Sequence, residues 1–129
     1  MKLFRNLLLL GIVTIFFANC SDSSFEQVGY FKQNKYRVFT FYINSSIKYD
    51  KDSIPNELWE KITKDGKSQK HTEGCQTQSF YYLNRSDAPD ITMFDNFINV
   101  VDKAYDNKPL AVYFKDERGN EGLIKYPEQ

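Results

Sequence analysis

The sequence predicts a small single-domain α/β (α+β) fold, a sandwich of one sheet and two helices in the order ββαβαββ. A chain of 129 residues is long enough for one ordinary domain and too short for two. Hydrophobic residues make up 41% of the chain and aromatic residues 16%, which is enough apolar surface for a packed core. Segments with a period of two residues alternate with segments of helical period, and this alternation predicts the element order.

Five segments have the composition of strands. Residues 36–43 give the strongest signal, because aromatic and β-branched side chains fill both faces of the pleat, as in a central strand covered on both sides. One face would carry Phe39, Phe41 and Ile43, and the other Tyr36, Val38, Thr40 and Tyr42. The other predicted strands cover residues 28–31, 77–83, 110–114 and 122–126, and the last two would form a hairpin.

The first helix is predicted between the strands at residues 36–43 and 77–83. Asp52 and Ser53 can cap its N-terminus, and Pro55 suits its first turn. The Asp65-Gly66 pair would end it, because glycine is favoured just beyond a helix. The side chains expected to face the core are Leu58, Trp59 and Ile62.

The second helix has the clearest amphipathic pattern in the chain. Thr92 followed by Asp95 resembles a capping box with Asp in place of Glu. Asn107 can stop the helix, and Pro109 lies just beyond it. The apolar side chains at helical spacing are Phe94, Phe97, Ile98, Val101 and Tyr105.

The core order βαβαββ, with Pro109 just before the final hairpin, is similar to the thioredoxin-like fold. Redox proteins of that fold carry two cysteines separated by two residues after the first strand. Asn44, Ser45 and Ser46 stand there in this chain. The resemblance therefore implies a topology and no dithiol chemistry.

The N-terminus differs in kind from the rest of the chain. Lys2 and Arg5 precede an uncharged apolar run at residues 7–18. The run is too short for a helix that crosses a bilayer of ~30 Å, which needs about 20 residues. Its length and its positive flank are typical of a signal peptide, whereas the alternative is a buried N-terminal helix of the core.

The end of this run, Phe17-Ala18-Asn19-Cys20, resembles the lipobox of bacterial lipoproteins. The resemblance covers the first 24 residues, and it departs from the usual pattern at Phe17, where Leu is usual, and at Asn19, where Gly, Ala or Ser is usual. It implies that a diacylglycerol is attached to the Cys20 thiol, that a further fatty acid such as palmitate joins it, and that cleavage leaves Cys20 as the first residue.

Three parts of the chain follow from this resemblance. They are a signal peptide at 1–19, the lipidated Cys20 with its polar tether at 20–27, and one α/β domain at 28–129. If Cys20 is lipidated, Cys75 is a single leftover thiol; if it is not, the two cysteines could form a disulfide in an oxidising compartment.

The charge of the chain argues against nucleic acid as a partner. The whole chain has 17 basic and 17 acidic residues, and removing residues 1–19 leaves 15 against 17, a net charge of −2. Such a balance attracts neither a nucleic-acid backbone nor anionic lipid headgroups.

One group of candidate metal ligands lies in the polar loop at residues 66–76. His71, Glu73 and Cys75 alternate, so on an extended segment they would point the same way and could bind zinc or copper. His71 and Cys75 could also act as a base and a nucleophile. The alternative is a polar loop with a solvated histidine and a small buried thiol. This alternative is the more common case, so no metal or other cofactor is predicted.

Tyrosines on the predicted strands form a second candidate site. If several shared an uncovered sheet face, they would make an aromatic platform for a peptide, a glycan or a protein, and the strongest candidates are Tyr42, Tyr82 and Tyr113. The alternative is that they pack under helices or against one another. The full set is Tyr36, Tyr42, Tyr81, Tyr82, Tyr113 and Tyr126.

These observations predict a small, non-catalytic lipoprotein of the bacterial cell envelope. It would be anchored by its lipid on the periplasmic side or at the outer membrane, and it would bind an envelope protein without a cofactor. The alternative is a thioredoxin-like redox or thiol-dependent enzyme that uses Cys75.

Overall fold

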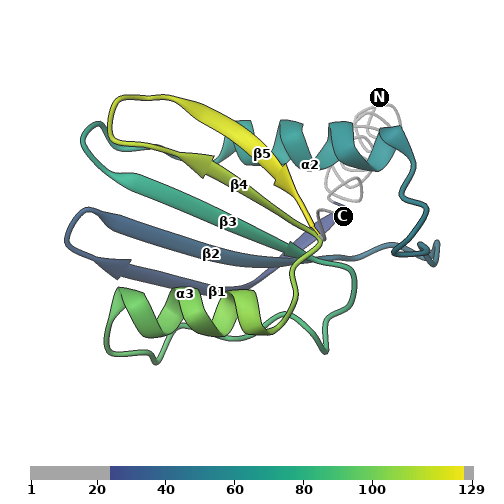
Figure 1. Ribbon diagram of the computed structural model, residues 1–129, viewed down its shortest axis with the longest axis horizontal. Coiled ribbons are helices and arrows are strands. Elements are labelled where there is room, and N and C mark those ends of the chain that lie inside the picture. Colours follow the sequence, from purple (N-terminus) through teal and green to yellow (C-terminus); the bar gives the residue numbers. More distant parts are fainter. Residues whose placement is uncertain (1–23, 127–129) are drawn as a thin grey trace, which may run out of the picture.

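The computed structural model describes residues 24–126, and Figure 1 shows them as one sheet with two helices. The strands are β1 (Phe25–Gln33), β2 (Tyr36–Ile43), β3 (Gln76–Tyr82), β4 (Ala111–Lys115) and β5 (Glu121–Lys125), and the helices are α2 (Asn56–Ser68) and α3 (Phe97–Asp106). The element order ββαβαββ and the small α/β sandwich are confirmed. The predicted signal peptide and Cys20 lie outside the described residues.

The sheet follows the chain order β1-β2-β3-β4-β5, so β1 and β5 are its edges. Neighbouring strands run antiparallel except for β2 and β3, which run parallel. Parallel neighbours need a long crossover connection, and the segment that contains α2 supplies it. The likeness to the thioredoxin-like fold concerned element order alone and stays a prediction.

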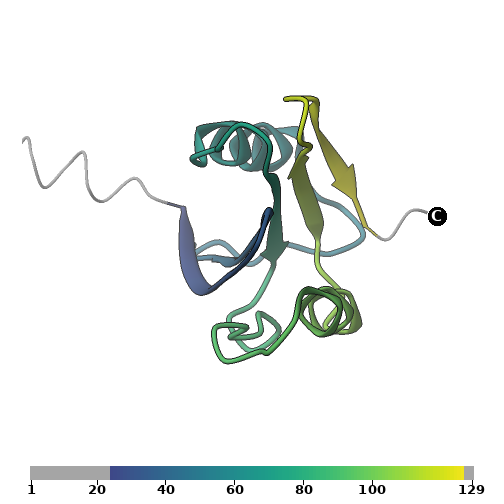
Figure 2. The ribbon, with the colours of Figure 1, turned by 90° about the vertical axis from the view of Figure 1, so that its left-hand side faces the viewer.

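The two helices lie on opposite faces of the sheet, as the end view in Figure 2 shows. They also cover different halves of it: α2 contacts β4 and β5, whereas α3 contacts β1 and β2. Each face of the sheet is therefore covered by a helix on one half only. Side chains on the other half of each face are covered by loops or lie at the surface.

The core beneath α3 joins the middle of the sheet to the loop that precedes this helix. Tyr82 is fully buried there, and its hydroxyl donates a hydrogen bond to the carbonyl oxygen of Ala104 at 2.6 Å. This bond satisfies a buried phenol that would otherwise destabilise the core. The buried members are Phe31, Val38, Phe80, Tyr82, Ala88, Ile91, Val100, Ala104 and Val112.

The core beneath α2 uses the opposite faces of the same strands. Phe41 and Ile43 lie on this side while Val38 lies on the other, so β2 is buried on both faces as predicted. The Tyr81 hydroxyl donates to Asp65 of α2 at 2.5 Å. The buried members are Phe41, Ile43, Leu58, Ile62, Tyr81, Leu110, Ala111 and Tyr113.

The helix α2 differs from its prediction at both ends. It starts after Pro55 without a side-chain cap, and Asp52 is instead part of a turn in which its N–H bonds to Asp50 Oδ1 at 3.0 Å. It also continues through Gly66 to Ser68. Gly66 is a packing residue here, because a Cβ at this position would lie 2.2 Å from Cγ of Tyr113. Local sequence cannot distinguish such a glycine from one that ends a helix.

The helix α3 begins later than predicted, and its buried face is shifted relative to the predicted stripe. Phe94 and Phe97 pack against the core as predicted, but Ile98 does not. The N-cap of α3 is Asn96, whose side chain accepts a hydrogen bond from the N–H of Asn99 at 2.9 Å. The buried residues are Val100 and Ala104, whereas Ile98 is 70% exposed. The physical reason is the small side chain of Ala104, which lets the helix come close enough to the sheet for its backbone to receive the Tyr82 hydroxyl.

The loop between β3 and α3 is fixed to the sheet by side chains. Thr40 Oγ1 donates to the carbonyl of Pro89 at 2.8 Å, and the N–H of Tyr30 reaches Thr92 Oγ1 at 3.5 Å. Gly29 permits this approach, because a Cβ there would lie 2.8 Å from the backbone nitrogen of Ile91. The loop therefore covers the part of the sheet near β1 that α3 does not reach.

Candidate binding surface

The predicted lipidation site, Cys20, lies outside the described residues, but the structure shows where the domain begins. The N–H of Asn44 donates to the carbonyl of Ser24 at 2.8 Å, and β1 starts at Phe25. Backbone pairing with the sheet thus begins before Val28, where the sequence placed the start of the domain. Little chain separates Cys20 from the sheet, so the domain would sit close to any membrane that holds the anchor.

The structure does not gather the candidate metal ligands into a site. They lie between α2 and β3, where His71 is half-buried, Glu73 is exposed and Cys75 is 9% exposed. Within residues 24–126, no three His, Cys, Asp or Glu side chains lie close enough together to hold a metal ion. Cys75 is a free, buried thiol, which is the environment of unreactive structural cysteines.

The three candidate tyrosines do not form a shared platform. Tyr82 is buried in the core beneath α3, and Tyr113 is buried in the core beneath α2. Burial raises the pKa of both phenols well above the ordinary value near 10. Tyr42 is half-buried, and its hydroxyl donates to Glu26, which raises its pKa. The three tyrosines therefore lie in three separate environments and do not share one accessible surface.

A row of aromatic rings that was not predicted runs from the half of the sheet that α2 leaves uncovered into the core beneath α2. Tyr30 and Phe39 lie 4.7 Å apart between ring centroids, and Phe39 stacks on Phe41 at 5.9 Å. The row continues inward to Tyr81, whose ring lies 5.2 Å from that of Phe41. Tyr30 is exposed at its outer end. The alternation in β2 predicts that Phe39 and Phe41 share a face of the sheet, but it does not predict which half of that face a helix leaves uncovered.

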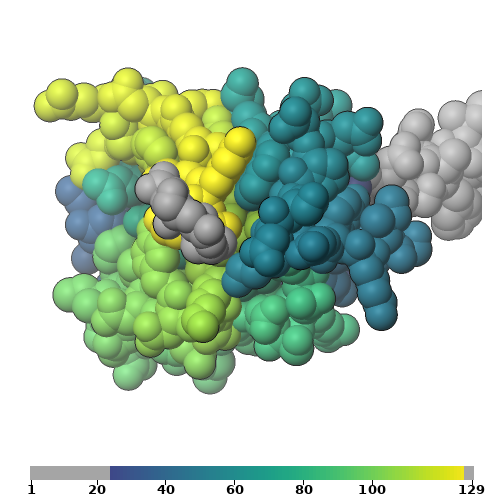
Figure 3. Space-filling view, turned by 45° about the vertical axis from the view of Figure 1, so that its right-hand side comes forward, coloured from purple at the N-terminus to yellow at the C-terminus, as the bar shows by residue number. Residues whose placement is uncertain are grey.

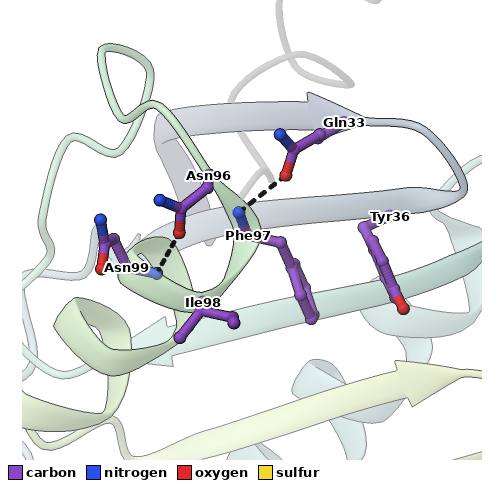
Figure 4. A pocket seen from close by; sticks show the side chains of 6 residues that line it. All are labelled: Gln33, Tyr36, Asn96, Phe97, Ile98 and Asn99. Carbon is purple, nitrogen blue, oxygen red and sulfur yellow. Dashed lines mark hydrogen bonds between the residues drawn. The ribbon is translucent and has the colours of Figure 1, made fainter.

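A shallow cleft of about 420 Å³ lies between the β1–β2 hairpin and the start of α3. Figure 4 shows the six side chains that line it: Gln33, Tyr36, Asn96, Phe97, Ile98 and Asn99. The rings of Tyr36 and Phe97 stack in parallel at 4.0 Å with an interplanar angle of 9°. We call this feature the hairpin cleft.

Hydrogen bonds of Gln33 hold the two sides of the hairpin cleft together. Its Oε1 accepts from the N–H of Phe97 at 2.9 Å, and its Nε2 donates to the carbonyl of Asp95 at 3.3 Å. Two apolar side chains at or near the hairpin cleft are exposed. Ile98, which lines the cleft, is 70% exposed, and Met93, three residues before Asn96 in the sequence, is 89% exposed. The cleft is thus a preformed aromatic and aliphatic surface with amide groups at its rim.

The chemistry of the hairpin cleft suits binding. Amide groups of Asn96 and Asn99 can exchange hydrogen bonds with a peptide backbone, and the aromatic pair offers contact area at low entropic cost. Among the described residues that line the cleft there is no carboxylate, imidazole, amine or thiol. The cleft therefore offers contact area and hydrogen bonds, and its lining holds no strong acid, base or thiol nucleophile.

A second groove of about 410 Å³ runs between α2 and the edge strand β5, on the face shown in Figure 3. The Lys125 ammonium lies 4.9 Å from the ring centre of Trp59, a cation–π contact across the groove. The lining residues are Trp59, Glu60, Thr63, Lys64, Lys67, Leu123 and Lys125. Its floor is apolar and its rim is mostly basic.

No protein-family model matches the chain, and neither a curated protein nor a solved structure shows significant similarity to it. Within residues 24–126, no helix is long and apolar enough to span a bilayer.

Proposed function

We propose that this protein is a lipid-anchored lipoprotein of the bacterial cell envelope that acts as a binding module. The observation that carries the anchor is the apolar run 7–18 behind Lys2 and Arg5, ending in the lipobox-like segment with Cys20. The anchor would hold the domain on the periplasmic side or at the outer membrane. One acyl chain alone gives marginal binding, because each buried CH₂ contributes ~0.8 kcal/mol, whereas the two chains of a diacylglycerol together with the further fatty acid give stable anchoring.

We propose the hairpin cleft as the surface that binds an envelope protein. Its support is the concentration of accessible apolar side chains at one end of the sheet, with Ile98 the most exposed residue of α3 that is large and apolar. The chain enters β1 at the opposite end of the sheet, as Figure 1 shows, so the tether does not start beside the cleft. An apolar side chain of the partner would pack on Ile98 and on the Tyr36–Phe97 stack.

The anchor is tested by Cys20→Ser with metabolic labelling by a fatty-acid analogue. The variant should take up no label and leave the membrane fraction, because the acyl transfer needs a thiol nucleophile and a hydroxyl is much weaker. Cys75→Ser is the matched control and should stay labelled, since Cys75 is buried in the domain. A wild-type protein without label would sink the lipoprotein assignment and make a Cys20–Cys75 disulfide the better account.

The binding surface is tested by placing a photo-crosslinking amino acid at Ile98 in living cells. We expect one discrete crosslinked envelope protein from this position. The control position is Lys61, which is exposed on α2 away from the cleft. Equal crosslinking from both positions, or crosslinking from neither, would contradict a binding role for the hairpin cleft.

A further inference from the structure

The outer edge of β5 has a hydrogen-bonding pattern that the ends of the β4–β5 hairpin define. At the turn, the N–H of Asp116 donates to the carbonyl of Asn120 at 2.8 Å. At the other end, the N–H of Tyr126 donates to the carbonyl of Leu110 at 2.9 Å. In an antiparallel pair, residues that bond to the partner strand alternate with residues whose backbone groups point away from it.

This alternation assigns the backbone groups of β5. Gly122 and Ile124 bond to β4, so the N–H and C=O groups of Glu121, Leu123 and Lys125 point to the free edge. β5 is the last strand of the sheet, and no backbone bond among residues 24–126 reaches these outer groups. The side chains of the same three residues share one face, the face that carries α2.

Along this edge, side chains of opposite charge lie at equal distances in sequence on either side of Leu123. This arrangement is complementary to the same edge of a second copy of the chain. Glu121 and Lys125 are equally spaced on either side of Leu123 and are both exposed, while Leu123 is half-buried. If two such edges run antiparallel about a two-fold axis at Leu123, each glutamate faces a lysine and the two leucines face each other. Opposite charges and apolar side chains directly opposite in neighbouring strands each stabilise a sheet.

We propose that β5 is a self-association edge, at which two copies of this chain pair β5 with β5 in antiparallel register around Leu123. The result is one continuous sheet through both copies with an isologous two-fold contact. The N–H of Leu123 donates to the C=O of Leu123 in the second copy, and the C=O of Leu123 accepts from the N–H of that residue. Glu121 and Lys125 form the flanking pairs in the same ladder.

The position of α2 fits this arrangement. Lys125 lies over Trp59, and α2 runs antiparallel to β5, so the axis at Leu123 passes near Thr63 on the helix. The same two-fold axis then places Glu60 of one copy opposite Lys67 of the other. Glu60 and Lys67 are therefore complementary across the axis, whereas the two copies of Lys64, next to Thr63, bring charges of the same sign near it.

The spacing of the strands leaves room for both helices. In the joined sheet the two β4 strands lie three strand spacings apart, roughly 14 Å at ~4.8 Å each. Helices pack side by side at roughly 8–10 Å, and α2 lies over β4 and β5, so the two copies of α2 flank the axis without overlap. The contact is small and should be weak in solution. Shared attachment to one membrane would raise the local concentration of the two copies.

The test uses two charge reversals in the full chain, purified in detergent and examined by sedimentation equilibrium. Lys125→Glu puts two carboxylates opposite each other, and Glu121→Lys does the same with two ammonium groups, so each variant should dissociate about tenfold more readily than wild type. An equimolar mixture of the two variants restores both opposite-charge pairs. We expect the mixture to form heterodimers as tight as the wild-type dimer.

Two further variants separate association from folding. Glu121 accepts a hydrogen bond from the Tyr113 hydroxyl at 2.7 Å, so the unfolding midpoint of each variant is measured first. Leu123→Pro removes the outward N–H and also a side chain that packs on the core beneath α2. It should abolish dimers while the sheet stays folded, because proline is tolerated on an edge strand where the N–H points outward. Lys61→Glu makes the same charge change away from the edge and should leave dimers intact. A wild type that is monomeric at about 1 mM, or a mixture that stays monomeric, overturns the proposal.

Discussion

At the scale of single residues, Gly66 allows α2 to pack closely on the sheet because glycine has no side chain. It lies in the last part of α2 against the ring of Tyr113. In sequence it follows Asp65, and the pair reads as the end of a helix. The close approach is a tertiary contact between segments far apart in the chain, so no local pattern could reveal it.

We expect Gly66→Ala to lower the free energy of unfolding by about 2 kcal/mol. Alanine favours a helix interior by ~1 kcal/mol over glycine, but its Cβ would overlap the Tyr113 ring, and overpacking typically costs ~1–3 kcal/mol or more. Urea unfolding measures the change, with the exposed Ser68→Ala in the same helix as the control. An alanine variant more stable than wild type would show that the ring moves aside freely.

Buried phenols make stability depend on pH in the alkaline range. Burial raises the pKa values of Tyr81 and Tyr82 well above 10, and the hydrogen bond from the Tyr81 hydroxyl to Asp65 raises that of Tyr81 further. The folded state therefore keeps protons that the unfolded chain releases near pH 10. Stability is fully present below pH 10 and falls as the pH rises toward the folded-state values.

This dependence is measured by urea unfolding at pH 8, 10 and 11.5 with tyrosinate absorbance recorded in parallel. We expect a progressive loss of stability between pH 10 and pH 11.5. The buried tyrosines should lose their protons together when the domain unfolds, so tyrosinate absorbance should rise with unfolding. Unchanged stability up to pH 12 would mean that these hydroxyls reach solvent.

At the scale of elements, the strands and the core-facing side of α2 were predictable, and the face of α3 was predictable only in part. Leu58 and Ile62 are buried and Trp59 packs on the core, as predicted. The alternation in residues 36–43 assigned Phe41 and Val38 to opposite faces correctly, because pleating is a local property. In α3, Ile98 was included in the predicted apolar stripe because its side chain is large and apolar, but it lies on an exposed face of the helix. Packing selected the face with Ala104 because close approach to the sheet needs a small residue there.

A matched pair of substitutions checks the register of α3. Val100→Ala should destabilise the domain by about 2 kcal/mol, since it removes two buried methyl groups and leaves a cavity. Ile98→Ala removes a larger but exposed group and should change stability by less than ~0.5 kcal/mol. Equal losses from both would show that the helix is rotated toward the predicted stripe.

The hairpin cleft also depends on contacts between distant elements. Tyr36 was assigned to a strand and Phe97 to a helix, but nothing local brings the two rings together. The same holds for Tyr82 and Tyr113, whose strands β3 and β4 are neighbours but whose side chains point to opposite faces. The sequence thus indicated the aromatic residues of the proposed binding surface, while the fold determines which of them are accessible.

At the scale of the whole molecule, both cores lie within residues 24–126, and no described contact requires the N-terminal segment. A chain shortened to residues 23–129 should therefore be soluble and unfold in one cooperative transition. Circular dichroism during urea unfolding measures this. An insoluble or molten product would mean that the apolar run 7–18 belongs to the core.

The single parallel junction between β2 and β3 has a consequence for the rate of folding. The two outer pairs, β1–β2 and β4–β5, are hairpins that close over a few residues and can form within microseconds. The central junction joins strands separated by the whole segment from Asn44 to Cys75, so its loop-closure entropy must be overcome before its contacts form. The β3–β4 junction likewise closes over the segment from Leu83 to Leu110. The order of events should therefore run from the two hairpins inward, with these two junctions as the slow steps.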